Sequence, residues 1–333
     1  MAATLEDSTV TYEELADLER EFEEVETEIL RRQVELTRPL YEKRAKVVAQ
    51  IPNFWPLVLE QAPPEIDEFV QPTDAALLLS SLTSLSVSHF EIEGGSNDGS
   101  GDPRSVAIRL EFADNDYFED RVIEKKFWYR RSLDGWSGLV SEPVEIRWKK
   151  DKDLTNGLLS LVKRVWDQEQ QQAASSNGNA PATAAEKRKA AKGRELTPDE
   201  KQLKAKIEEV GLGGMSLFAW FGYRGPKVSA EENRRAIEKE KNDKKLRLAG
   251  KKPEVDKKDE EDEDDDEEWD ELEIFPEGDT LAIAIAEDLW PNALKFFTQA
   301  QEQDALSDMD FESDEDAMEE GSDTEPPSKK VKS

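Results

Sequence analysis

A stripe of apolar residues near the start of the chain constrains the fold more than any other feature. Over residues 11–50, large apolar side chains recur at alternating spacings of three and four, which is the a/d pattern of a coiled coil. The positions between them are mostly glutamate and arginine, so this helix needs a partner to bury its stripe. No second segment of this pattern and length occurs in the chain, which favours a homodimer over a surface helix packed on its own domain. The candidate dimerisation residues are Leu15, Leu18, Phe22, Val25, Ile29, Leu36 and Leu40.

The sequence also predicts where this helix begins and ends. Thr11 followed by Glu14 fits a capping box at the start. Pro39 lacks a backbone donor, so we expect a kink there, while the apolar pattern resumes beyond it. The pair Ile51 and Pro52 closes the element, and the predicted dimerisation helix covers residues 11–52.

Composition excludes several classes of protein. The 333 residues carry a net charge of −32, contain no cysteine and contain a single histidine, His89. Disulfides, a His/Cys zinc site and a Ser-His-Asp triad are therefore excluded, and we expect neither a metal nor another cofactor. No apolar run is long enough to span a bilayer, and no signal peptide is visible at the start. We expect a soluble intracellular protein that is repelled by membranes and nucleic acid and attracted to a basic partner.

The middle of the chain predicts an α+β domain with a four-stranded antiparallel sheet backed by helices. Alternating apolar residues mark strands at 82–92, 106–112, 127–129 and 144–148, and a slip in the first suggests a bulge between Val87 and Phe90. Thr197, Pro198 and Glu200 predict the start of a later helix.

The domain boundaries follow from composition. We expect a disordered N-terminus at 1–10, the domain at 53–300, and an acidic tail at 301–333. Within the domain, 167–212 is partly low in complexity and 224–270 has almost no apolar face, so both are expected to be mobile inserts.

An unbroken acidic run follows the basic part of the second insert. It is a candidate site for a basic partner, with a disordered solubilising run as the alternative. The basic residues before it could pair with it and compete with that partner. The run consists of Asp259, Glu260, Glu261, Asp262, Glu263, Asp264, Asp265, Asp266, Glu267 and Glu268.

Two signals lie in the tail. Ser307, Ser313 and Ser322 each have an acidic residue three positions later, which is the pattern of an acid-directed kinase such as casein kinase II. A basic cluster then interrupts the acidic tail and predicts nuclear import, with shuttling to the cytoplasm left open. Its lysines are Lys329, Lys330 and Lys332.

Short motifs in a fixed order resemble a known family. They lie at residues 38–44, 51–55 (Ile-Pro-Asn-Phe-Trp), 112–118 (Phe-Ala-Asp-Asn-Asp-Tyr-Phe), 145–149 (Glu-Ile-Arg-Trp-Lys), 152–155, 218–221 (Phe-Ala-Trp-Phe) and 287–294 (Glu-Asp-Leu-Trp-Pro-Asn-Ala-Leu). Together they resemble the SET-type proteins of the nucleosome assembly protein family over roughly residues 11–297. The two inserts look longer than the family's usual connections.

The resemblance implies a function as well as a fold. Such proteins dimerise through the long helix into a headphone-shaped dimer and bind core histones on the underside of the domain; they are chaperones, not enzymes. The partners are H2A–H2B, H3–H4 or both, and the sequence leaves the preference between these pairs open. The resemblance places Asp279, Glu287 and Asp288 in the histone-facing segment, with a solvated helix face as the alternative, while Thr280 stands where the family has another carboxylate. Nucleic acid is then contacted only indirectly.

Two alternatives to a histone chaperone remain, a regulatory partner of another enzyme and an enzyme in its own right. SET-like proteins also act as regulatory partners of a protein phosphatase or a histone acetyltransferase. An enzyme in its own right is the weakest hypothesis, because no nucleophile, metal-ligand set or phosphate loop is visible in the sequence.

Overall fold

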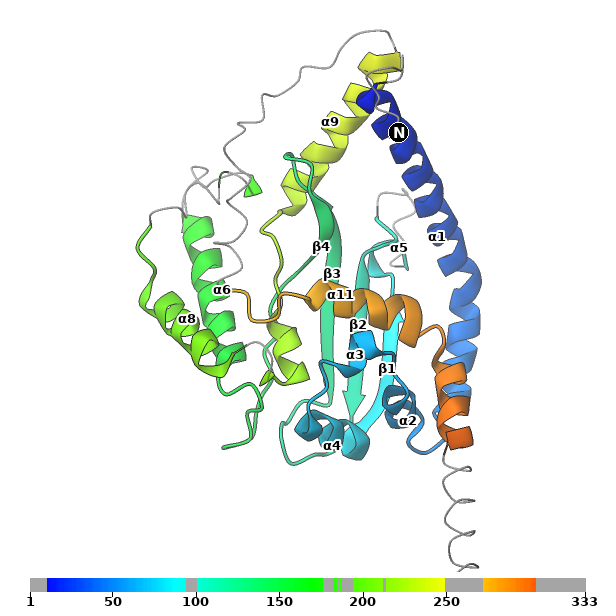
Figure 1. Ribbon diagram of the computed structural model, residues 1–333, viewed down its shortest axis with the longest axis vertical. Coiled ribbons are helices and arrows are strands. Elements are labelled where there is room, and N and C mark those ends of the chain that lie inside the picture. Colours follow the sequence, from blue (N-terminus) through cyan, green and yellow to red (C-terminus); the bar gives the residue numbers. More distant parts are fainter. Residues whose placement is uncertain are drawn as a thin grey trace, which may run out of the picture.

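The computed structural model describes residues 11–93, 101–175, 183–184, 186, 194–211, 214–248 and 272–303. The long helix α1 (Tyr12–Val48) runs down one side of the molecule (Figure 1). Its capping box is confirmed, since Glu14 N donates to Thr11 Oγ1 at 3.2 Å and Thr11 N donates to the Glu14 carboxylate at 2.9 Å. The helix continues through Pro39 as one element.

A four-stranded antiparallel sheet forms the centre of the domain, as predicted. Its strands lie in the order β1-β2-β3-β4. They are β1 (Leu82–Ser88), β2 (Val106–Phe112), β3 (Val122–Arg131) and β4 (Ser137–Ser141). Period-two alternation places Leu110 and Phe127 on the buried face of the sheet, whereas Trp128 points to the opposite face. One face therefore carries the core.

Two details of the sheet differ from the sequence prediction. The fourth strand lies at β4 and not at 144–148, where Val144 N donates to Phe221 O and Trp148 makes only an isolated bridge to Phe118. Residues 144–148 are extended because they pack on the aromatic residues of 218–221. This packing gives the segment an alternating, strand-like pattern although it is not paired in the sheet. The irregularity of β1 lies between Leu82 and Ser84, and the short helix α5 (Phe90–Glu93) follows the strand.

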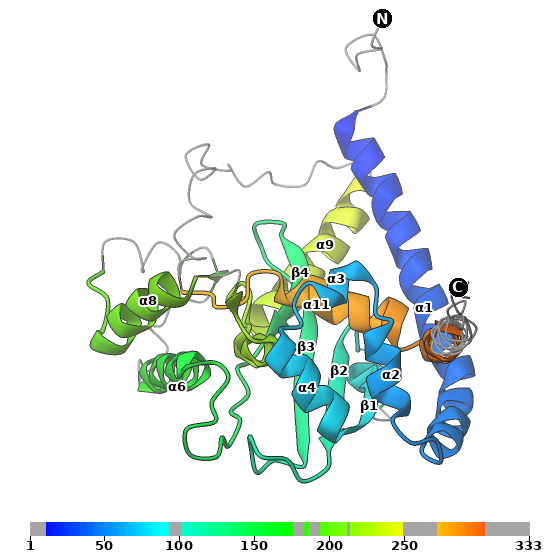
Figure 2. The ribbon, with the colours of Figure 1, turned by 60° about the horizontal axis from the view of Figure 1, so that its bottom comes forward.

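Helices cover the buried face of the sheet (Figure 2). They are α2 (Phe54–Glu60), α3 (Pro64–Asp67), α4 (Pro72–Ser81), α11 (Gly278–Ile283) and the π-helical turn η4 (Ala284–Leu289). The 3-10 turn η3 (Leu217–Gly222) adds an aromatic cluster, in which the rings of Trp220 and Phe127 stack 5.3 Å apart. Burial of these rings is the main stabilising contribution in this part of the core.

Three helices belong to the long connections. The first two pack on each other at one end of the domain, and the third runs from the β3–β4 hairpin towards the start of α1 (Figure 1). Thr197 caps the second of them with Glu200, as predicted. The mobility of the two inserts stays a prediction. The three helices are α6 (Leu158–Ser175), α8 (Pro198–Val210) and α9 (Ala230–Leu248).

Arg44 fastens the end of α1 to the domain. Its guanidinium lies 4.6 Å from the centroid of the Trp290 ring and 4.7 Å from that of Tyr41, and Nη1 donates to Trp290 O at 2.5 Å. Burial lowers the pKa of Arg44, but the group stays cationic, as arginine does in proteins. Cation–π contact and a charge-assisted hydrogen bond thus join α1 to the segment after η4.

We expect Arg44→Met to lower the free energy of unfolding by about 1–3 kcal/mol, because both interactions are lost and a carbonyl loses its donor. The measurement is chemical denaturation of both proteins at matched concentration. Lys43→Met is the matched control, since the neighbouring Lys43 is exposed. Equal losses in the two variants would contradict this role for Arg44.

Candidate functional site

The apolar stripe of α1 is exposed to solvent. The exposed fraction is 63% for Phe22 and 60% for Ile29, and all seven candidate dimerisation residues are exposed, as is Val47. Eight large apolar side chains along one side of a helix form a continuous apolar surface, which monomeric proteins rarely expose. We call this surface the rod stripe (Leu15, Leu18, Phe22, Val25, Ile29, Leu36, Leu40 and Val47).

A second side of α1 faces the domain, and the sequence analysis missed it. Val34 and Val48 are buried, while Tyr41 packs on Trp290 with 3.9 Å between ring centroids. Among the α1 residues whose burial the structure describes, none before Val34 is buried. The second half of α1 is therefore anchored by apolar packing, and the first half is held differently.

The first half of α1 is held by ion pairs. Glu23 Oε1 accepts from Arg104 Nη1 at 2.6 Å and from Arg131 Nη2 at 2.7 Å, so one carboxylate lies between two guanidinium groups. Although burial opposes it, pairing with Asp102 and Glu23 raises the pKa of Arg104 above its ordinary value. The β1–β2 connection and β3 thus meet α1 at Glu23.

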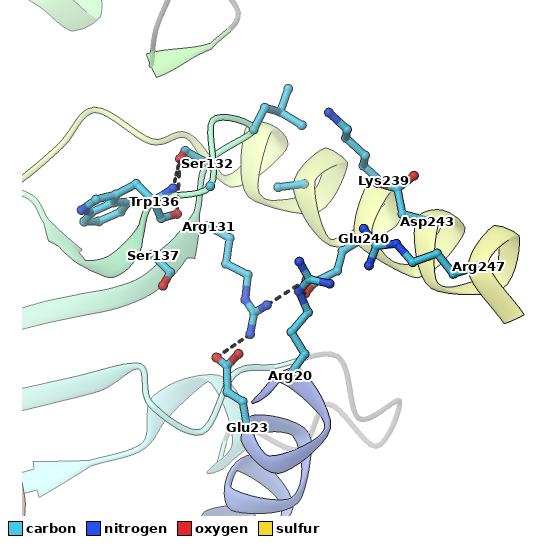
Figure 3. A pocket seen from close by; sticks show the side chains of 13 residues that line it. Arg20, Glu23, Arg131, Ser132, Trp136, Ser137, Lys239, Glu240, Asp243 and Arg247 are labelled. Carbon is cyan, nitrogen blue, oxygen red and sulfur yellow. Dashed lines mark hydrogen bonds and ion pairs between the residues drawn. The ribbon is translucent and has the colours of Figure 1, made fainter. Parts of the chain in front are cut away.

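Helix α9 contributes further ion pairs to the same half of α1. Glu240 pairs with Arg131 at 2.8 Å and with Arg20 at 3.3 Å. These side chains line a polar cleft of about 290 Å³ between α1, the β3–β4 hairpin and α9 (Figure 3). Near its end, α9 adds Lys244, which pairs with Glu24 at 2.9 Å, and Arg247, which pairs with Asp17.

The candidate histone-facing carboxylates lie on α11 and η4. Glu287 and Asp288 are exposed neighbours on η4, whereas Asp279 is half-buried one element earlier and accepts from Thr280 N at 2.9 Å. Leu281 and Leu289 are fully buried and hold this segment on the sheet. The structure therefore presents Glu287 and Asp288 together on a well-anchored segment, with Asp279 set apart from them.

Several predicted residues cannot be placed. The acidic run 259–268, the three candidate phosphorylation serines and the import lysines all lie outside the described residues. Over the described part of the chain, no cluster of three His, Cys, Asp or Glu side chains could hold a metal ion. No helix among those residues has the length and apolarity to cross a membrane.

Comparison with known proteins agrees with this architecture. The family model described as nucleosome assembly protein (NAP) matches residues 43–300. A putative nucleosome assembly protein of Schizosaccharomyces pombe is 35% identical over 166 residues, which cover 47% of this chain and 64% of that protein. Vacuolar protein sorting-associated protein 75 of Saccharomyces cerevisiae is 23% identical over 96% of this chain and 93% of its own length.

A solved structure shares the fold. The crystal structure of Vps75 superposes with a TM-score of 0.50 at 22% identity and covers 86% of this chain and 96% of that chain. The matched region covers 64% of the Schizosaccharomyces pombe protein and 52% of NAP1-related protein 1 of Oryza sativa, so the chain spans about half to two thirds of the length of these curated relatives. A long helix on a four-stranded sheet covered by helices defines the class of NAP-fold proteins. The chain belongs to the nucleosome assembly protein family, and its relatives include Protein SET of Drosophila melanogaster, which is 30% identical over 38% of this chain and 43% of that protein.

Proposed function

We propose that the protein is a histone chaperone that acts as a homodimer. The observation that carries this proposal is a pair of exposed carboxylates, Glu287 and Asp288, on a segment fixed by its buried face, within a chain of net charge −32. Histones are strongly basic, so such a surface attracts them. Family membership supports the proposal, and the similar yeast protein Vps75 is described as a histone chaperone.

Weak individual contacts suit this task. An exposed ion pair contributes only about 0.2–1 kcal/mol and is screened by salt. DNA competes for the same basic cargo with its dense phosphate charge. A chaperone whose affinity is a sum of weak contacts holds histones off DNA and still releases them. We extend the proposal to the acidic run 259–268 as a second contact, and to nuclear import through the basic cluster near the C-terminus.

The charge of α1 indicates how two copies pair. Residues 12–30 contain nine carboxylates and one arginine, for a net charge of −8, while residues 31–48 contain six basic and two acidic residues, for a net charge of +4. Parallel pairing of the rod stripe would place like charges together. Antiparallel pairing places the acidic half of each helix along the basic half of its partner, and charge complementarity of this kind fixes orientation. We propose an antiparallel dimer.

We expect Glu287→Lys with Asp288→Lys to weaken binding of a core histone pair roughly tenfold at moderate salt, because two attractions become repulsions in each copy. The measurement is a fluorescence titration of labelled histones. The control is Glu208→Lys with Glu209→Lys, which makes the same change of charge on the exposed side of α8. An equal loss in the control would show that net charge, and not this surface, sets the affinity.

A further inference from the structure

Helix α9 is attached to the domain in two different ways along its length. At its base, Asn233 Oδ1 accepts from Arg131 N at 2.8 Å, Glu232 Oε2 accepts from Ala184 N at 2.8 Å, and Ala236 is buried. Beyond these residues, the contacts recorded for the described part of α9 are ion pairs with α1 and Arg131. The base is therefore fixed by buried contacts and by hydrogen bonds to the backbone, whereas ion pairs join the tip to α1.

The contact at the tip places a basic helix against an acidic one. Residues 239–248 carry five basic and two acidic side chains, a net charge of +3, and the half of α1 that they meet carries −8. The pairing groups are partly exposed, with 41% of the Lys244 side chain and 66% of the Glu24 side chain accessible. Water and salt reach these pairs, so the contact is weak and screened by ions.

Within one protomer, the half of α1 that receives this tip has few other contacts with the domain. None of its residues whose burial the structure describes is buried, and Glu23 ties it to the domain through Arg104 and Arg131. The basic half of α1 is packed on Trp290 and does not depend on α9. Release of α9 would thus free its tip from α1, while α1 stays packed in the proposed dimer and the rest of the domain stays folded.

We propose that α9 is an electrostatic latch, closed in this structure, which a polycationic partner opens by competing for Asp17 and Glu24, the α1 carboxylates that Arg247 and Lys244 of α9 hold. The proposal rests on the proposed function in naming core histones as the natural polycation. Opening frees the carboxylates that α9 pairs with, so cargo binding and latch release favour each other. A closed latch keeps these carboxylates paired within the protomer, so weakly basic proteins do not displace α9.

The chain offers a direct test because it contains no cysteine. Spin labels on Glu19→Cys in α1 and Asn242→Cys in α9, both at exposed positions, report the separation of the two helices by double electron–electron resonance. The labelled chain is diluted with unlabelled chain so that distances within one protomer dominate. We expect a narrow distribution at low salt, and a broad, longer one at high salt, with a core histone pair, or with polylysine.

Variants of the labelled chain separate the latch from general charge effects. Lys244→Gln with Arg247→Gln removes two ion pairs and shifts the equilibrium toward the open form by roughly 2- to 30-fold. Lys241→Gln with Lys245→Gln makes the same change of charge on the exposed side of α9 and leaves the distribution narrow. A narrow distribution in the first variant, or in the wild type under both salt and polylysine, overturns the latch. Failure of histones alone to bind, with polylysine still opening α9, contradicts the proposed function and leaves the latch supported.

Discussion

Replacing Phe22 and Val25 by aspartate is expected to convert the protein from a dimer to a monomer. Both side chains lie on the rod stripe with 63% and 57% of their surface exposed, and the proposed dimer buries four of them. Each large apolar side chain contributes about 1.5–3 kcal/mol when fully buried, and a carboxylate in its place must be desolvated. The dissociation constant should rise at least about a thousandfold. Sedimentation velocity over a range of concentrations measures it.

A control variant makes this prediction specific. Leu79 on α4 is 50% exposed and lies outside the rod stripe, so Leu79→Asp changes surface apolarity without touching the proposed interface. We expect this variant to remain a dimer. A wild-type chain that sediments as a monomer at micromolar concentration would contradict both the dimer and its antiparallel arrangement. Dissociation of the Leu79 variant would show that the stripe is not the interface.

The long helix shows what a single sequence reveals and what it conceals. The alternating spacing of Leu18, Phe22 and Val25 identified one side of α1 correctly as apolar and continuous. The side of α1 that faces the domain was not predicted. Its anchors are Val34, Tyr41 and Arg44, which are an aliphatic, an aromatic and a charged residue, so they do not form a periodic pattern of hydrophobicity. Periodicity detects a stripe of one chemical kind, whereas packing against a domain accepts any side chain with a suitable partner.

The sheet was predictable where its strands alternate. Strand β2 was located to the residue, but β4 (Ser137–Ser141) was missed because Leu139, Val140 and Ser141 are all buried and show no alternation. The candidate site was predicted in part. Glu287 and Asp288 came from the family motif, while the pairs of Arg104 and Arg131 with Glu23 join residues about 80 to 110 positions apart, which no local pattern reveals.

Lys125 is a buried cation that the sequence analysis passed over. It lies on β3 between the buried residues Ile123 and Phe127, so its side chain enters the core. Its Nζ donates to three carbonyl oxygens at 2.9–3.0 Å, those of Glu142, Phe221 and Tyr223. The amino group thus joins β3 to η3 and to the segment after β4.

Burial lowers the pKa of Lys125 to about 7, against the opposing attraction of Glu273 and Glu142. The ordinary value of 10.5 applies to the unfolded chain. Between pH 7 and pH 10.5 the unfolded chain binds more protons than the folded one, so Lys125 makes the free energy of unfolding rise with pH across this window. Below pH 7 the amine is protonated in both states, and Lys125 no longer makes stability depend on pH. The slope from one such group is about 1.4 kcal/mol per pH unit.

We expect Lys125→Met to be less stable than the wild type by about 2–4 kcal/mol at pH 9, because three buried carbonyls lose the hydrogen bond from the amine. Phe221 O keeps the hydrogen bond from Val144 N, and Glu142 O keeps a longer one from Ser141 Oγ at 3.4 Å. At pH 7 the difference should shrink by about 2–3 kcal/mol, since the amine of the wild type must release its proton on folding, at a cost that grows as the pH falls toward 7, and the variant has no such cost. Urea denaturation from pH 6.5 to 9.5 measures it.

Lys126→Met is the matched control for this pH profile. Lys126 is the next residue of β3 and points to the opposite, exposed face, where 44% of its side chain is accessible. Its replacement should leave the pH dependence of stability parallel to that of the wild type, because its side chain is exposed and folding does not remove its charge from water. Parallel profiles for wild type and Lys125→Met would show that the amine is charged throughout, held as an ammonium by its three carbonyl acceptors.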